Sequence, residues 1–155
     1  MTKISVELIK KLREETGAGV MRVKKVLEEF KGDEKKALDV LKAEGFEKVA
    51  KREGRETGQG KVFTYSHHTG KVVSVVELLC ETDFVAKNEL IQNLGKEIAL
   101  QVASMDPKNN KELMDQDFIK DPKKKISDLI KEVIAKTGEN IKLGQFARIE
   151  VGAKA

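Results

Sequence analysis

The chain has 155 residues, of which 39% are hydrophobic, 36% are charged and 5% are aromatic. This composition is typical of a helix-rich globular protein, and no stretch approaches the 18 consecutive apolar residues that indicate a membrane span. The net charge of +4 is concentrated in residues 1–55, which hold 15 basic and 11 acidic residues; this is usual for a solvated lysine-rich surface and also suits an acidic partner or RNA.

The first residues contain no apolar signal region and lead directly into an amphipathic pattern. Cys80 is the single cysteine, so an internal disulfide is excluded. We therefore expect a cytoplasmic protein that does not enter a membrane.

Residues 1–50 have the pattern of three short helices. Ser5 is placed to cap the first helix, and Gly17 in the sequence TGAG is placed to end it. Asp33 is placed to begin the third helix and Gly45 to end it. Apolar residues recur at helical spacing: Val6, Leu8, Ile9 and Leu12 in the first helix, then Val20, Val23, Val26, Leu27 and Phe30 on the expected buried side of the second, then Ala37, Leu38 and Leu41 in the third. These helices predict a small domain, followed by a charged, glycine-containing linker at residues 51–60.

Residues 61–155 predict an α+β core. Residues 61–66 and 71–80 read as a β-hairpin, and the nearly continuous apolar character of the second strand indicates a central position or burial on both faces. Helices are predicted from Leu90 to about Asp106 and over residues 125–136. The final strand is expected to place these side chains on one face: Ile141, Leu143, Ala147, Ile149 and Val151. The order of elements predicts a three-stranded antiparallel sheet with helices on one face.

The sequence contains no recognisable catalytic set. The stretch GRETGQGK resembles a phosphate-binding loop, but its glycine spacing is wrong and Val62 replaces the Ser or Thr that would bind magnesium. His67, His68 and Cys80 do not supply the four ligands of a structural zinc site. We expect no enzymatic activity, no cofactor and no metal; an enzyme that uses Asp83 with one of these histidines is the least favoured alternative.

Two aromatic residues leave open a role in RNA binding. Phe63 and Tyr65 alternate along the first predicted strand, so both rings lie on one face. A core face is the simpler interpretation. The alternative is a stacking surface, which together with the basic N-terminal third would make a basic RNA-binding or ribosome-associated module.

The sequence ETDFVAKNEL, residues 81–90, lies between a predicted strand and a predicted helix. Thr82 is a natural N-cap, and Asp83 falls in the first helical turn, where the helix dipole favours an acid. Two interpretations of Phe84 remain open. It is either buried under the sheet, or exposed at the helix tip, where an aromatic next to an acid is suited to insertion into a partner.

Three motifs, in order along the chain, resemble the bacterial translation elongation factor Ts family. ETDFVAKNEL resembles the most characteristic motif of that family. LIKKLREETGAGVMRVKKVLEE, residues 8–29, resembles its N-terminal signature, and KTGENIKLGQFARIE, residues 136–150, resembles its C-terminal signature. The resemblance covers most of the chain.

The resemblance implies a guanine-nucleotide exchange factor that promotes release of GDP from elongation factor Tu. It also implies an N-terminal domain similar to ubiquitin-associated domains, over residues 1–50, and a core over residues 61–155. The resemblance assigns two sets of partner-binding residues: Thr82, Asp83, Phe84 and Val85 would displace the partner's magnesium, and Val20, Met21 and Lys24 would contact its GTPase domain. The partner would be bound in its GDP-bound and nucleotide-free forms, and no direct contact with nucleic acid is expected.

The chain departs from the family in four places. The segment at about residues 106–125 is shorter than in many relatives, and short members resemble half of a two-lobed core, which implies a homodimer that rebuilds the second half. Arg22 stands where relatives often have Asp, and Gly144 and Gln145 stand where they often have basic residues. Ala147 replaces a cysteine found in some short members, which excludes a disulfide-linked dimer through that position.

Overall fold

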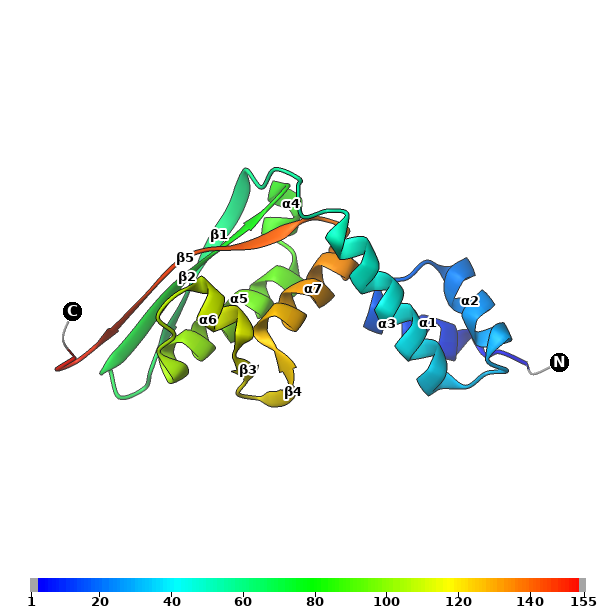
Figure 1. The fold of residues 1–155 in the computed structure, drawn as a ribbon, viewed down its shortest axis with the longest axis horizontal. Helices are drawn as coiled ribbons and strands as arrows, with labels where there is room; N and C mark the ends of the chain where they lie inside the picture. The colour runs from blue at the N-terminus through cyan, green and yellow to red at the C-terminus, as the bar shows by residue number, and fades with distance from the viewer. Residues whose placement is uncertain (1–2, 154–155) are drawn as a thin grey trace.

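The computed structural model describes residues 3–153, and in it three helices lead into a sheet that carries further helices on one face (Figure 1). The first three helices are α1 (Val6–Thr16), α2 (Val20–Glu29) and α3 (Glu34–Ala50). The elements that follow are β1 (Gln59–Ser66), β2 (Val72–Cys80), α4 (Asp83–Ala86), α5 (Glu89–Met105), α6 (Asn110–Asp115), β3 (Asp117–Phe118), β4 (Asp121–Lys125), α7 (Ile126–Thr137) and β5 (Ile141–Glu150). No helix among residues 3–153 is both long enough and apolar enough to cross a membrane.

The ends of α1 form as its capping residues predict. The Ser5 hydroxyl accepts a hydrogen bond from the Leu8 N–H at 3.1 Å, which satisfies one of the free donors of the first turn. Gly17 ends the helix in the left-handed conformation, with φ at 70°. The three helices enclose a small core of their own, made of Leu12, Val23, Val26, Leu27, Ala37 and Leu41.

Helix α3 is longer than predicted, because Gly45 does not end it. The helix continues to Ala50, so that its second half reaches the core (Figure 1). A Cβ atom at Gly45 would stand 3.3 Å from the Cβ of Ala135 in α7. Glycine at this position therefore allows two helices to approach closely and does not act as a helix stop.

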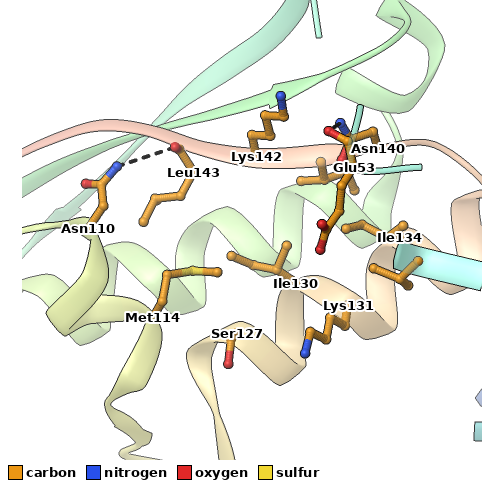
Figure 2. Close-up of a pocket in the computed structure, with 12 residues that line it drawn as sticks. Glu53, Asn110, Met114, Ser127, Ile130, Lys131, Ile134, Asn140, Lys142 and Leu143 are labelled. Carbon is orange, nitrogen blue, oxygen red and sulfur yellow. Dashed lines mark hydrogen bonds between the residues drawn. The ribbon is translucent and has the colours of Figure 1, made fainter. Parts of the chain in front are cut away.

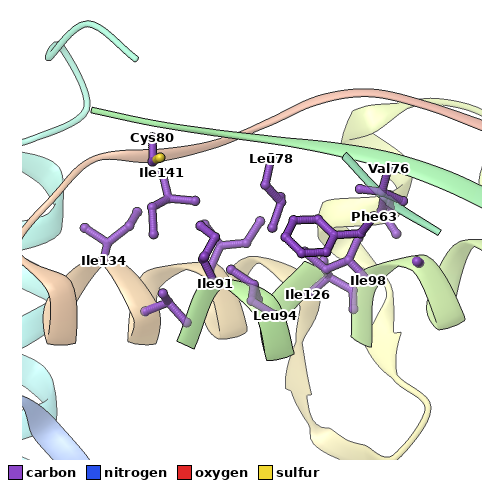
Figure 3. Close-up of a cluster of buried hydrophobic side chains, with 14 of the residues drawn as sticks. Phe63, Val76, Leu78, Cys80, Ile91, Leu94, Ile98, Ile126, Ile134 and Ile141 are labelled. Carbon is purple, nitrogen blue, oxygen red and sulfur yellow. The ribbon is translucent and has the colours of Figure 1, made fainter. Parts of the chain in front are cut away.

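The sheet has the strand order β1-β2-β5, with both neighbouring pairs antiparallel. Helices α5 and α7 cover one of its faces, and the main hydrophobic core fills the space between (Figure 3). Phe63 is 5% exposed and lies against Gly95 of α5, where an added Cβ would collide with its ring. The predicted α+β fold is confirmed, and Phe63 belongs to the core.

The central strand β2 is buried on one face only. Val76 and Leu78 are fully buried against the helices, whereas Val73 and Val75 on the other face are 37% and 38% exposed. The central position predicted for this strand is confirmed, but burial on both faces is not observed. The outer face of the sheet is open in this chain, and exposed valines lie on it among polar residues such as Thr64 and Glu77.

Strand β5 changes the direction of its side chains half-way along. Gly144 and Gln145 together stand opposite the single residue Glu77, and this irregularity has the form of a β-bulge. The Glu77 carboxylate accepts a hydrogen bond from the Gln145 N–H at 3.1 Å. Ile141 before the bulge is 3% exposed, and Ile149 after it is 76% exposed. The prediction of a single apolar face for this strand is therefore wrong, because one additional residue reverses the alternation.

A short helix and a small hairpin connect α5 to α7, and no sequence pattern predicted them. Strands β3 and β4 form the hairpin, and α6 precedes it. Gln101 of α5 is fully buried and fixes the hairpin, since its amide donates to the Asp117 carbonyl at 3.0 Å and accepts from the Ile119 N–H at 3.0 Å. Leu113 and Phe118 add apolar anchors to the core. The polar composition of the segment between α5 and α7 therefore does not mean that it lacks secondary structure.

Candidate functional site

The turn α4 presents Phe84 to solvent. The Thr82 hydroxyl caps the turn by accepting from the Val85 N–H at 3.3 Å, as the sequence predicts. Val85 and Ala86 are 9% and 3% exposed and anchor the turn in the core. Phe84 is 89% exposed. The expectation that this ring lies outside the core is confirmed, and burial under the sheet is excluded.

Asp83 stands beside the aromatic ring and is exposed as well. Its carboxylate accepts a hydrogen bond from the Lys87 ammonium, one turn away, at 2.8 Å. This hydrogen bond raises the pKa of Lys87 above its ordinary value. The tip of α4 therefore combines a large apolar ring with an acid that is accessible to a partner.

The GENI part of the C-terminal motif holds the start of this turn. Both carboxylate oxygens of Glu139 accept hydrogen bonds from Thr82: one from its backbone N–H at 3.0 Å and one from its hydroxyl at 2.6 Å. These residues are 57 positions apart in the chain. The ETDFVAKNEL motif and the C-terminal motif, which are distant in sequence, are therefore in direct contact through Thr82 and Glu139.

A second set of contacts joins the same region to the segment after α3. The Asn140 side-chain amide donates to the backbone carbonyl groups of Glu53 at 3.3 Å and Arg55 at 2.9 Å. The Asn140 N–H donates to the Glu81 carboxylate at 3.1 Å, and Arg55 lies 3.5 Å from the same carboxylate. These residues lie within the motifs or the predicted linker, but the sequence patterns assigned them no function. The polar residues that follow Gly138, which ends α7, were the one local feature that indicated a role here.

The start of α2 is the second predicted contact region, and its residues are exposed. Met21 is 74% exposed and Val20 is 44% exposed, and the Lys24 side chain lies at the surface near Glu28. The prediction that Val20 lies on the buried side of its helix is wrong, because the helix begins at this residue and neither α1 nor α3 covers it.

Arg22 lies beside this second region and is engaged within the chain. Its guanidinium forms a two-point contact with the Glu44 carboxylate of α3, with Nε to Oε2 at 2.9 Å. The hydrogen bond from Arg22 lowers the pKa of Glu44, with the positive charge of Arg22 as a further cause. Arg22 therefore ties the start of α2 to α3.

The remaining candidate groups do not assemble into a reactive site. Burial, followed by the nearby Glu139 and Asp83 carboxylates, raises the pKa of the Cys80 thiol, so the thiolate needed for nucleophilic attack is disfavoured. Within residues 3–153 no group of three or more His, Cys, Asp or Glu side chains could hold a metal ion. Cys80 is fully buried and acts as a small hydrophobic residue of the core.

A cavity of about 420 Å³ lies between α3, α6, α7 and β5 (Figure 2). Its floor is apolar, and the Glu53 side chain extends toward the isoleucines of α7. Asn140 and Glu53, which are hydrogen-bonded to each other next to Glu139, both line it. None of the seven predicted partner-binding residues lines this cavity.

Comparisons with known proteins connect these motifs. A family model described as elongation factor TS matches residues 81–155. The elongation factor Ts of Leptospira biflexa is 44% identical over 194 residues, covering 96% of this chain and 98% of the relative. The corresponding proteins of Thermosipho melanesiensis and Nitratidesulfovibrio vulgaris are 39% and 38% identical and cover 96% and 97% of this chain, and 99% and 98% of their own lengths. This chain therefore belongs to the elongation factor Ts family and has a role in translation elongation.

Proposed function

We propose that this protein is a guanine-nucleotide exchange factor that promotes release of GDP from elongation factor Tu in the cytoplasm. The observation that carries the proposal is Phe84, a large aromatic residue that is 89% exposed, although the two residues after it, Val85 and Ala86, are buried. An exposed ring of this kind buries little apolar surface within its own chain and is suited to a pocket in a partner.

The four residues that the resemblance assigns to this contact, Thr82 to Val85, divide into two kinds. Phe84 and Asp83 face outward and would meet the partner, whereas Val85 is buried and Thr82 is bound to Glu139. We infer that Phe84 enters between helices of the GTPase domain and disturbs its magnesium site, with Thr82 and Val85 holding the ring in place.

The physical basis of exchange needs no contact with the nucleotide. GDP is held by backbone donors and by a magnesium ion that bridges its phosphates to the GTPase. A factor that stabilises a GTPase conformation with poorer contacts of this kind weakens GDP binding, and GDP weakens binding of the factor by the same free energy. The insertion of a ring favours one of two discrete arrangements, because packed interiors do not deform continuously.

Val20, Met21 and Lys24 would provide a second contact with the GTPase domain. Two exposed apolar side chains and a cation lie together at the start of α2, and Arg22 holds that helix to α3. A second contact increases affinity without being part of the magnesium displacement.

The direct test follows release of a fluorescent GDP analogue from elongation factor Tu after adding the parental chain. We expect faster release with the parental chain, and Phe84→Ala is expected to slow it by roughly thirtyfold, the scale of losing a central interface residue. Met105→Ala, at the exposed end of α5, is the control for loss of an exposed apolar side chain. No acceleration by the parental chain would exclude the proposal, and parental release rates with Phe84→Ala would exclude the role of the ring.

The RNA-binding alternative has lost its aromatic support. Phe63 is in the core, and Tyr65 is partly buried against the same core. What remains is the positive charge of the N-terminal third. Salt-dependent binding of RNA to the chain in the absence of elongation factor Tu would favour this alternative.

We also propose that two copies of the chain pair through the outer face of the sheet. Four exposed apolar side chains lie there on three adjacent strands: Val62, Val73, Val75 and Ile149. An apolar face of this kind is usual at interfaces between subunits. Sedimentation equilibrium should give twice the mass of the chain, and Val75→Lys should give the mass of one chain; a parental chain that sediments as a monomer would exclude the pairing.

A further inference from the structure

Each carboxylate oxygen of Glu139 accepts a hydrogen bond from the same residue, Thr82. Glu139 accepts from the Thr82 N–H at 3.0 Å and from the Thr82 hydroxyl at 2.6 Å. Within residues 3–153 this carboxylate forms no ion pair with a Lys, Arg or His side chain. Both of its oxygens therefore accept hydrogen bonds from Thr82, the cap residue that precedes α4.

The second hydrogen bond fixes the orientation of the Thr82 hydroxyl. A hydroxyl group has one proton, and here it is donated to Glu139, which leaves the oxygen lone pairs to accept from the Val85 N–H. The hydroxyl thus links the carboxylate to the helix cap, because it donates its proton to Glu139 and accepts from the Val85 N–H. Hydrogen bonds to an ionised acceptor are stronger than those between neutral groups.

Glu139 is itself on a rigid support. It follows Gly138, which ends α7 in the left-handed conformation with φ at 76°. The next residue, Asn140, is 2% exposed and is bound on three sides by Glu53, Arg55 and Glu81. The position of the carboxylate is therefore set by the end of a long helix and by the first residue before β5.

The turn α4 needs such support because it is short. A four-residue helix is far below the length at which helices are stable by themselves, so its geometry depends on tertiary contacts. Its buried residues, Val85 and Ala86, hold its middle and end, and Thr82 holds its beginning. Phe84 lies between these two attachments.

We propose that Glu139 is a positioning residue for Phe84, which acts through Thr82 and is required for fast nucleotide exchange. This inference rests on the proposed exchange function. A turn whose backbone is already fixed loses less conformational freedom when Phe84 enters the partner than a mobile turn would, so loss of this support weakens binding.

The first measurement is amide hydrogen exchange of the chain without a partner. Glu139→Ala removes both acceptors, so the amides of Val85, Ala86 and Lys87 should exchange about tenfold faster or more, while amides of α5 and β2 keep their parental protection. Glu112→Ala, at an exposed position on α6, is the matched control. Unchanged protection of the three turn amides would overturn the inference whether or not the protein exchanges nucleotide.

The second measurement is nucleotide release from elongation factor Tu with single and double variants. Glu139→Ala should slow release by about tenfold. Because Glu139 acts through Phe84, the double variant Phe84→Ala/Glu139→Ala should be no slower than Phe84→Ala alone. If the two losses multiply, or if Glu139→Ala releases at the parental rate while Phe84→Ala is slow, the positioning role is wrong.

The third variant separates position from folding. Glu139→Gln preserves the shape of the side chain and one acceptor for the Thr82 N–H, and it should release nucleotide at a rate between those of the parent and Glu139→Ala. A rate equal to that of Glu139→Ala, in a variant with parental thermal stability, would also contradict the proposal. Failure of the parental chain to accelerate release would instead exclude the exchange function, with the hydrogen-exchange result unaffected.

Discussion

Phe84 and Met21 are both exposed apolar side chains, but they are supported in different ways. Phe84 stands on a four-residue turn whose start is held by hydrogen bonds that Thr82 donates to a residue 57 positions away. Met21 stands on α2, a ten-residue helix whose opposite side is buried in the N-terminal core through Val23, Val26 and Leu27. The first depends on two buried side chains and on a few polar contacts at its start, and the second depends on apolar packing over several turns.

This difference indicates which substitutions should affect each region. The position of Phe84 should be sensitive to single polar residues far from it in sequence. The position of Met21 should be sensitive to the way the three helices dock on α7. Packing is distributed over many atoms, so most single truncations near Met21 should have small effects.

The largest effect on the Met21 region is expected at Gly17, where the N-terminal helices meet the core. A Cβ at this position would lie 2.7 Å from the Cα of Lys136, and φ is 70°. Gly17→Ala should lower the free energy of unfolding by about 2–4 kcal/mol, from the left-handed backbone and from overpacking. Urea denaturation measures this.

The control for that substitution is Gly54→Ala. Gly54 has no neighbouring atom within 4 Å of an added Cβ and does not have a positive φ. Its effect should stay within about 0.5 kcal/mol. Equal losses at the two glycines would show that docking of the helices on α7 does not control stability.

A smaller effect is expected from the contact between Arg22 and Glu44. Arg22 holds the pKa of Glu44 below that of an unfolded glutamate, which is about 4.3. The pair therefore contributes stability above that pH and loses it as the pH falls through the folded pKa. Glu44→Gln should unfold at a lower urea concentration than the parent at pH 7, and the difference should shrink toward pH 3.

The pH dependence also tests the contrast between the two regions. A difference between Glu44→Gln and the parent that stays constant from pH 7 to pH 3 would contradict the electrostatic account. If Glu44→Gln slowed nucleotide release as much as Glu139→Ala, polar contacts would control both regions and the contrast would be lost.

The smallest effect on stability is expected for Met21→Ala. The side chain is 74% exposed, so the free energy of unfolding should change by less than about 0.5 kcal/mol. Nucleotide release should slow by about threefold to tenfold, as for a residue at the edge of an interface. A larger loss with Met21→Ala than with Phe84→Ala would make the start of α2 the main contact.

Sequence patterns predicted the features that depend on neighbouring residues. The caps at Ser5 and Thr82 bond three residues ahead, and the helices and strands follow from local periodicity. Patterns did not predict the contact between Thr82 and Glu139, since nothing local specifies which of many acids will meet a distant threonine. The exposure of Phe84 was also open until the family resemblance favoured it.

Two errors have the same origin, which is that a residue type has more than one use. Gly45 is a residue type that often ends helices, but here it allows α3 to pack closely against Ala135. Gly144 lies in a stretch of sequence whose apolar residues alternate regularly. The bulge there could not be recognised without knowing the partner strand and the position of Glu77. A local pattern gives the possible functions of a glycine, and the tertiary contact selects one of them.

The bulge in β5 also separates two sets of positions that a regular strand would link. Ile141, before Gly144, lies in the core, whereas Ile149, which a regular strand would place on the same face, lies on the outer face. A deletion of one residue here would exchange the two faces along half of the strand, whereas a substitution changes one position. The outer surface of the sheet can therefore diverge by point substitution while the core stays the same, provided that the length of this strand is kept.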